Sequence, residues 1–202
     1  MMRWQKRAFD IAVAVVLILI LAPVLLVIAL AIIILDGRPV LFIGERMKSP
    51  TESFKMVKFR TMRPDPGDFG ATGAHKNGRI TRTGALLRKS RLDEIPQLWN
   101  ILLGDMSFVG PRPPLRTYVE RFPEVYDRVL QIRPGVTGLA SIYYSGHEHH
   151  IMRNCATTEE ADELYARVCI PRKMHLDLIY ARHQSVCFDV ILMIRTLFTA
   201  LR

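Results

Sequence analysis

The feature that most restricts how this chain can fold is an uninterrupted apolar segment from Ile11 to Leu35. The segment is 25 residues long and carries no charged side chain. As a straight helix it would measure roughly 37 Å, which exceeds the hydrocarbon core of a bilayer at about 30 Å. It is also too long for the apolar part of a cleaved signal peptide, and no small-residue cleavage site follows it. The segment therefore predicts a helix in contact with a membrane.

The centre and the flanks of this segment leave two topologies open. Ala22 and Pro23 lie near its middle, where a proline removes one backbone donor and clashes with the preceding helical turn. Basic residues flank both ends, with Lys6 and Arg7 before the segment and Arg38 after it. Because Lys and Arg tend to stay on the cytoplasmic side, a re-entrant helix hairpin that enters and leaves by one face satisfies both flanks. A single kinked span is the alternative, since prolines are common in such helices.

The composition of the remaining chain fits one domain joined to this helix. Half of the 202 residues are hydrophobic although 23% are charged. The net charge of +9 favours an anionic partner such as lipid headgroups or phosphorylated ligands. The three cysteines show no CxxC spacing, so a disulfide framework or a zinc site is not expected. We therefore divide the chain into a membrane helix over residues 1–37 and a cytoplasmic domain over residues 38–202.

The sequence of residues 38–202 predicts short helices with a few extended segments. Extended segments are expected at 40–43 and 54–59, a loop at 64–79, and a turn at 133–138. The prolines and glycine of 107–114 exclude a regular helix there. The last helix fits either the core or the lipid interface. Helices are expected at 83–91, 93–103 with Gly104 after it, 117–132, 159–166, 173–183 and 188–201.

Adjacent carboxylates at Asp93 and Glu94 are the densest candidate for chemistry. Pro96 is tolerated near a helix start, so Asp93 is predicted as an N-cap with Glu94 in the first turn. The helix N-terminus and the basic residues just upstream, Arg88 among them, would lower the pKa of both carboxyl groups. Such carboxylates can bind Mg²⁺ or attack phosphorus. Taken alone, however, the pair is more simply an ordinary helix cap.

Two further segments could bind phosphate. Prolines on both sides of Arg112 would fix the backbone and aim the guanidinium rigidly, as a phosphate clamp requires. The glycines of residues 133–138, which follow Arg133, would let the backbone approach a ligand or adopt a positive φ. A surface turn with a solvated Arg112 explains the first segment equally simply, whereas for residues 133–138 an ordinary connecting turn is the simpler interpretation.

Other polar and aromatic residues predict no separate site. Residues 147–150 contain three histidines, but their spacing matches no zinc-binding pattern, so a polar loop is expected. Trp4 fits an anchor at the membrane interface, and Trp99 is expected in the core. The basic residues are not interleaved with stacking aromatics, so nucleic-acid binding is not supported.

Taken together, these residues resemble a known family. The ungapped run from Ser90 to Pro113 is similar to the signature of the bacterial sugar transferases, and in particular of the small monotopic phosphoglycosyl transferases. Two departures are visible: the helix break is Ala22-Pro23 where the family usually has Ser-Pro, and residues 139–172 do not follow the usual pattern. Supporting similarities occur at Lys6, Arg7, Asp10, 58–62, 79–82, 133–139, Asp177 and Tyr180.

This resemblance implies a reaction and a set of residue roles. It implies transfer of a sugar-1-phosphate from a UDP-sugar to polyprenol (undecaprenyl) phosphate, with release of UMP, at the start of surface glycan assembly. It implies a covalent aspartyl-phosphosugar intermediate and Mg²⁺. Asp93 would be the nucleophile and a metal contact, and Glu94 its catalytic partner. The phosphate-binding side chains would be those of Lys58 and Arg88, with Arg112 and Arg133 as further candidates.

The expected fold is one α/β-type domain, mostly helical with a small sheet, on the cytoplasmic face of the bacterial inner membrane. It would be monotopic, held by the re-entrant helix hairpin and by interfacial amphipathic helices, with membrane lipids as partners and a homodimer as a possible state. The alternative function is a catalytically silent, membrane-anchored scaffold that binds anionic lipid or a glycan-assembly partner. Such a scaffold would show a disrupted carboxylate pair or basic set, and the sequence has both intact.

Overall fold

The computed structural model describes residues 4–63, 78–153, 155 and 157–200, so most of the loop predicted at 64–79 lies outside it. The strands are β1 (Leu41–Met47), β2 (Ser53–Phe59), β3 (Ser107–Val109) and β4 (Gly135–Thr137). The helices are α1 (Trp4–Leu35), α2 (Arg82–Lys89), α3 (Gln97–Leu103), α4 (Arg116–Arg121), α5 (Pro123–Val129), α6 (Leu139–Met152), α7 (Thr158–Leu164), α8 (Ile170–His183) and α9 (Val186–Ala200), with a 3₁₀ turn η2 (Leu92–Glu94) and a π-helical turn η3 (Tyr165–Cys169). The expectation of a mostly helical chain with a small β component is confirmed.

The strands form two separate two-stranded sheets within these residues. β1 and β2 are antiparallel, with Arg46 opposite Phe54 and Phe42 opposite Lys58. Phe54 and Met56 point from β2 into the main core cluster, as the alternation along that strand predicts. β3 and β4 are parallel. The prediction of a turn over residues 133–138 was therefore wrong at its centre, because those residues form the strand that pairs with β3.

The glycines of this second pair serve close backbone packing. A Cβ atom placed on Gly135 would lie 2.1 Å from the amide nitrogen of Gly110, and one on Gly110 would lie 2.3 Å from the carbonyl oxygen of Arg133. Gly135 has no positive φ, since the positive-φ glycines among residues 4–63, 78–153 and 157–200 are Gly37 and Gly104. The expectation of a positive φ was wrong here, because these glycines instead let two strands meet. An approach of this backbone to a ligand stays a prediction, and Gly135 lines a small hollow.

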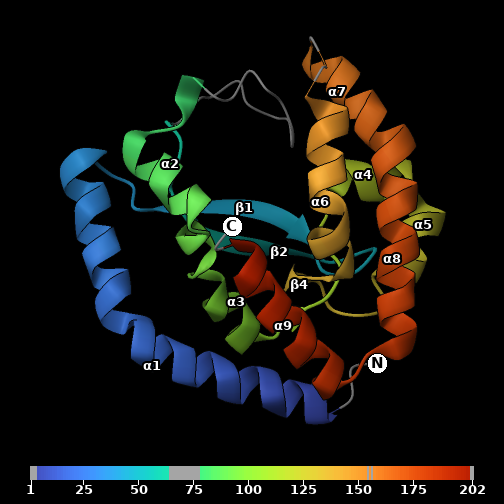
Figure 1. The fold of residues 1–202 in the computed structure, drawn as a ribbon, viewed down its shortest axis with the longest axis horizontal. Coiled ribbons are helices and arrows are strands. Elements are labelled where there is room, and N and C mark those ends of the chain that lie inside the picture. Colours follow the sequence, from blue (N-terminus) through green and yellow to red (C-terminus); the bar gives the residue numbers. More distant parts are fainter. Residues whose placement is uncertain (1–3, 64–77, 154, 156, 201–202) are drawn as a thin grey trace.

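The long N-terminal helix α1 is sharply bent, as Figure 1 shows, and Pro23 is the proline inside it. A proline is an ordinary cause of such a kink, since it removes one backbone hydrogen bond. The arm before the bend places Ala14 in the main core cluster. The arm after the bend packs Ile28 and Ile32 against Phe59 of β2 and other residues. Both arms therefore contact the same globular body, and α1 is long and apolar enough to cross a membrane.

Three other expectations need correction. The helix predicted at 117–132 is divided into α4 and α5 at Phe122, because Pro123 cannot donate the hydrogen bond that would continue α4. Residues 147–150 lie in α6, not in a loop, and this helix packs beside α8. Trp99 is 57% exposed. Its neighbours Leu98 and Ile101 already supply the buried face of α3, so Trp99 projects outward.

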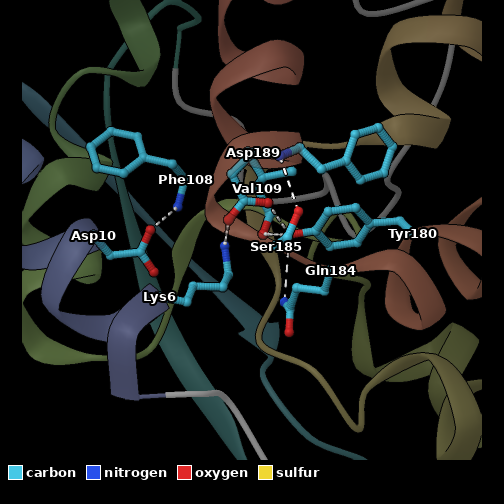
Figure 2. Close-up of polar contacts among 9 residues, drawn as sticks. Lys6, Asp10, Phe108, Val109, Tyr180, Gln184, Ser185 and Asp189 are labelled. Carbon is cyan, nitrogen blue, oxygen red and sulfur yellow. Dashed lines mark hydrogen bonds and ion pairs between the residues drawn. The ribbon is translucent and has the colours of Figure 1, made fainter.

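A buried polar cluster joins the first helix to the last two. Figure 2 shows Lys6 of α1 donating to Asp189 of α9, with the Lys6 Nζ 2.5 Å from the carboxylate. The hydroxyl of Tyr180 in α8 lies 2.6 Å from the second oxygen of Asp189 and 3.0 Å from the carbonyl oxygen of Val109 in β3. The three side chains are 3%, 0% and 0% exposed. This cluster therefore ties α1, α8, α9 and β3 together inside the core.

The cluster yields a test of stability. Asp189→Asn keeps an oxygen acceptor but removes the charged partner of the Lys6 ammonium and leaves only the nearby Asp10 to balance it, which is expected to cost about 1.5–3 kcal/mol. Thermal unfolding in detergent micelles would show the loss. The paired change Lys6→Met with Asp189→Leu should recover part of it, because the ion pair is removed as a unit while the buried Asp10 loses the nearby charge of Lys6. Asp127→Asn, at an exposed position, is the matched control, and an Asp189→Asn protein that unfolds like this control would contradict the assignment.

Candidate active site

The carboxylate pair lies in the 3₁₀ turn η2, between α2 and α3. Arg91 immediately before it has φ 55° and ψ 16°, a left-handed conformation that costs a non-glycine residue free energy. This single reversal directs the chain from the end of α2 back toward β2. Asp93 is the central residue of η2, and α3 begins only at Gln97. The prediction that Asp93 is the N-cap of a helix over 93–103 was therefore wrong.

Pro96 supplies the physical reason for this local geometry. A proline has no amide hydrogen, so the α-helical bond from position 96 back to position 92 cannot form. The turn closes instead with shorter-range bonds, from the Glu94 amide to the Arg91 carbonyl (3.2 Å) and from the Ile95 amide to the Leu92 carbonyl (3.3 Å). The two carboxylates consequently project from a tight turn ahead of the helix.

Glu94 is paired with two cations. The Lys58 Nζ donates to its Oε1 at 2.8 Å, and a terminal nitrogen of Arg112 lies 3.5 Å from the same oxygen. Burial acts to raise the pKa of Glu94, but Arg112, Lys58 and Arg91 together hold that pKa below its ordinary value. The prediction of a lowered pKa is thus confirmed for Glu94, although its cause is these side chains.

Lys58 reaches the pair because of strand alternation. Phe54, Met56 and Lys58 share one face of β2, so the first two fill the core while the third, at the end of the strand, meets η2. Asn100 of α3 fixes this arrangement, because its side chain accepts from the Val57 amide at 3.0 Å and donates to the backbone of the same strand. Burial lowers the pKa of Lys58, while Glu94 acts in the opposite direction.

Asp93 is in a different electrostatic situation from its neighbour. It is 8% exposed, and burial followed by the charge of Glu94 raises its pKa, against the opposing effects of Lys58 and Arg88. No ion pair to its carboxylate is found in the described part of the chain. The prediction of a lowered pKa was therefore wrong for Asp93, because burial and a like charge outweigh the two cations. Arg88 itself is oriented by a hydrogen bond from its Nε to Thr61 Oγ1 at 2.8 Å.

The two candidate arginines lie at different places. Arg112 follows β3 between Pro111 and Pro113, and the backbone there is fixed by a hydrogen bond from the Gly135 amide to the Pro111 carbonyl at 2.9 Å. The Arg133 guanidinium lies 3.8 Å from where a Cβ on Gly104 would stand, at the C-terminal end of α3. Arg112 is thus beside Glu94, whereas Arg133 is at the opposite end of that helix.

A small hollow opens beside the pair, and its lining includes Arg46, a residue that the sequence reasoning missed. Lys58, Glu94 and Arg112 also line this hollow, whose volume of about 10 Å³ is enough for roughly one water molecule. A signal for Arg46 was available: in a hairpin it stands opposite Phe54, and cross-strand partners share a face. Burial and the nearby Arg112 lower the pKa of Arg46.

The fit of this site to a divalent cation can be judged from its donor groups. No group of three or more His, Cys, Asp or Glu side chains that could hold a metal occurs among the residues described. Mg²⁺ commonly uses only one or two carboxylates and takes its remaining ligands from water and substrate phosphates. The raised pKa of Asp93 marks a carboxylate whose charge is incompletely balanced. Asp93 therefore fits such an ion, provided that a phosphate ligand completes its coordination.

The chain thus combines one helix apolar enough to cross a membrane with a carboxylate pair among cations, an arrangement suited to phosphate-bearing ligands at a membrane. The sequence model described as bacterial sugar transferase matches residues 1–202. The chain belongs to the bacterial sugar transferase family.

Several curated relatives are similar to this chain. It is 33% identical over 97% of its length to a UDP-N-acetylgalactosamine-undecaprenyl-phosphate N-acetylgalactosaminephosphotransferase of Aeromonas hydrophila, covering 43% of that protein. It is 34% identical over 97% of its length to a UDP-glucose:undecaprenyl-phosphate glucose-1-phosphate transferase of Escherichia coli K12, covering 40% of it. An exopolysaccharide production protein PSS of Rhizobium leguminosarum is 45% identical over 68% of this chain and 72% of the relative. The chain thus spans less than half the length of the first two.

The opposite pKa shifts of the two carboxyl groups predict opposite effects on stability. Because the pKa of Asp93 is raised, its contribution to the stability of the fold is lost as the pH rises through the pKa that Asp93 has in the folded state. Asp93→Asn should therefore raise the melting temperature at pH 7, and the gain should vanish below about pH 4. Because the pKa of Glu94 is lowered, its contribution is present at neutral pH and is lost as pH falls.

Glu94→Gln is accordingly the matched comparison. It should lower stability at pH 7 by about 1–3 kcal/mol, since it removes the charge that pairs with the buried Lys58 ammonium. Melting curves of both variants between pH 4 and pH 8 would check the two signs. Two variants that shift in the same direction would contradict the electrostatic difference between the carboxylates.

Proposed function

We propose that this chain is a phosphoglycosyl transferase, which moves a sugar-1-phosphate from a UDP-sugar to polyprenol phosphate and releases UMP. The observation that carries the proposal is the unequal pair: Glu94 is neutralised by Lys58 and Arg112, while Asp93 is buried without an ion pair to any of the described residues. The relatives whose names specify UDP-sugars and undecaprenyl phosphate support the same substrate classes.

The chemistry assigned to Asp93 takes two steps. A carboxylate oxygen of Asp93 attacks the β-phosphorus of the UDP-sugar, and an O–P bond forms while the bond from that phosphorus to the bridging oxygen breaks. UMP leaves with this oxygen and its electron pair. A phosphate oxygen of the polyprenol phosphate then attacks the same phosphorus, and the O–P bond to Asp93 breaks to restore the carboxylate. Splitting the transfer in this way is the usual advantage of a covalent intermediate.

The surrounding cations overcome the repulsion between a carboxylate and a diphosphate. Lys58 and Arg112 offset the charge of Glu94 and remain close enough to attract phosphate oxygens. Arg88, held by Thr61, places a further positive charge near Asp93. Mg²⁺, for which Asp93 is the protein ligand we propose, would supply additional charge neutralisation at the diphosphate when bound.

We assign the chain to the cytoplasmic face of the inner membrane, as a monotopic protein with α1 re-entrant. The support is the bend of α1, together with the contact that each of its arms makes with the same body. Arg60 reinforces the second arm by donating to the carbonyl oxygens of Asp36 and Gly37 at 2.6 and 2.7 Å. Exposed apolar side chains on α3 and α9, including Leu103 and Phe198, supply interfacial surface beside α1.

The activity can be tested directly. Asp93→Asn should reduce UMP release by at least roughly a thousandfold, because the nucleophile is lost. The assay would use purified protein in detergent with undecaprenyl phosphate, Mg²⁺ and a panel of UDP-sugars. Trapping with donor alone, followed by mass spectrometry of the peptide that contains Asp93, should reveal the phosphosugar adduct. Removal of Mg²⁺ with a chelator should abolish turnover, and a fully active Asp93→Asn protein would refute the mechanism.

The topology has a separate test. In a background with Cys155, Cys169 and Cys187 replaced by alanine, single cysteines at the exposed positions Gln5 and Arg38 should both resist an impermeant maleimide added to intact cells. Both should react once the cells are lysed, since both flanks of a re-entrant helix face the cytoplasm. Labelling of position 38 alone from outside the cell would instead establish a span.

A further inference from the structure

A second, larger cavity lies beside Arg112, on the side of this arginine away from Glu94. Its volume is about 260 Å³, and its walls come from β1, the segment after β3, α4, α5, α6 and α8. These helices stand on the side of the molecule away from the bend of α1, as Figure 1 shows. We call it the distal cavity; the polar residues that matter here are Arg46, Arg112, Glu148, Lys173 and Asp177.

The distal cavity adjoins the small hollow beside Glu94. Arg46, Arg112 and Pro113 line both this cavity and the small hollow that also contacts Lys58 and Glu94. A ligand whose phosphates meet the two arginines can therefore extend one way toward the carboxylate pair and the other way into the distal cavity.

The far end of the cavity offers no unpaired cation among its lining residues. Lys173 donates to Glu148 at 2.8 Å and to the hydroxyl of Tyr165 at 3.1 Å, so its ammonium is already engaged. Asp177, 7% exposed, adds a second carboxyl group to this wall. Burial raises the pKa of Asp177 to about 7, and the charge of Glu148 is already paired with Lys173, so no unpaired cation here attracts a phosphate. The anionic part of a ligand is thus confined to the arginine end, and an uncharged polar part suits the far end.

The size of the cavity and its hydrogen-bonding groups indicate which uncharged part of the ligand the far end would bind. Pockets that enclose a drug-sized ligand measure about 300–1,000 Å³, so a cavity of about 260 Å³ holds one ring rather than a whole nucleotide sugar. A hexose presents several hydroxyl donors, whereas uracil presents one N–H donor and two carbonyl acceptors. The Glu148 carboxylate is an acceptor, and Asp177, whose pKa burial raises to about 7, accepts through its carbonyl oxygen even when it is protonated. The rings of Tyr118 and Tyr126, which also line the cavity, suit the apolar face of a sugar.

We propose that the distal cavity binds the hexose ring of the nucleotide-sugar donor, and that Glu148 and Lys173 determine which sugar is accepted. The proposal rests on the proposed function, because it takes the donor to be a UDP-sugar. It assigns a role to Glu148 of α6 and to its ion pair with Lys173 of α8. Neither residue touches the reacting phosphorus; their role is selection.

Binding measurements separate this proposal from the activity itself. In the Asp93→Asn protein, which is expected not to consume donor, dissociation constants would be measured for UDP-glucose, UDP-galactose, their N-acetylated 2-amino counterparts, and UDP alone. Glu148→Gln should weaken the best-bound UDP-sugar about tenfold, since a hydroxyl loses a charged acceptor. The same change should leave UDP within about twofold, because UDP carries no sugar. Lys173→Met should alter the ratio between the 4-epimers UDP-glucose and UDP-galactose.

The outcomes are distinct. Equal weakening of UDP and UDP-sugar would place the base in the cavity and overturn the proposal. Unchanged affinities, or binding of UDP without binding of any UDP-sugar, would overturn it as well. Glu159→Gln, at an exposed position on α7, is the matched control and should change nothing. Retained UDP binding shows that a variant is folded. If donor binds with the expected pattern but the wild-type protein releases no UMP, the proposed function fails while the sugar site stands.

Discussion

The ion pair between Lys6 and Asp189 is the contact on which the rest of the structure depends. It brings the start of α1 against α9, although the two residues are 183 positions apart in the sequence. Tyr180 extends the pair to the Val109 carbonyl of β3, and the strand leads directly to Arg112. Because a buried charge without its partner is costly, these elements must assemble together. The apolar helix α1 and the segment that carries Arg112 are thereby held in fixed positions relative to each other.

The positions of neighbouring cations also explain why the two adjacent carboxyl groups differ. Two adjacent acidic residues in one tight turn would ordinarily repel each other and interact with the same neighbouring cations. Here the end of β2 and the segment after β3 both supply a cation to Glu94, and neither forms an ion pair with Asp93. Adjacent groups of nearly identical chemistry therefore acquire opposite pKa shifts. The proposed mechanism benefits from this difference, since no ion pair would have to be broken before Asp93 attacks.

Local sequence predicted the parts of this fold that depend on local chemistry. Alternation predicted β2, the apolar run predicted α1, and Gly104 predicted the end of α3, where its φ is 88°. What failed required knowledge of distant neighbours. The strand at 135–137 is formed only because β3 is available to pair with it. The pKa of Asp93 is raised by burial, which no nearby residue reveals. Trp99 was expected inside because of its size, yet the period of α3 directs it outward.

The position of Arg112 links the two substrates that the proposed reaction requires. On one side of this arginine lies the carboxylate pair, and α1, the element suited to a lipid, packs against the α3 that follows that pair. On its other side lies the distal cavity, bounded by helices that α1 does not cover in Figure 1. A lipid phosphate and a water-soluble nucleotide sugar can then approach from different directions without competing for one entrance. The prolines beside Arg112 fix the backbone from which its side chain extends, and the contact with Glu94 orients the guanidinium.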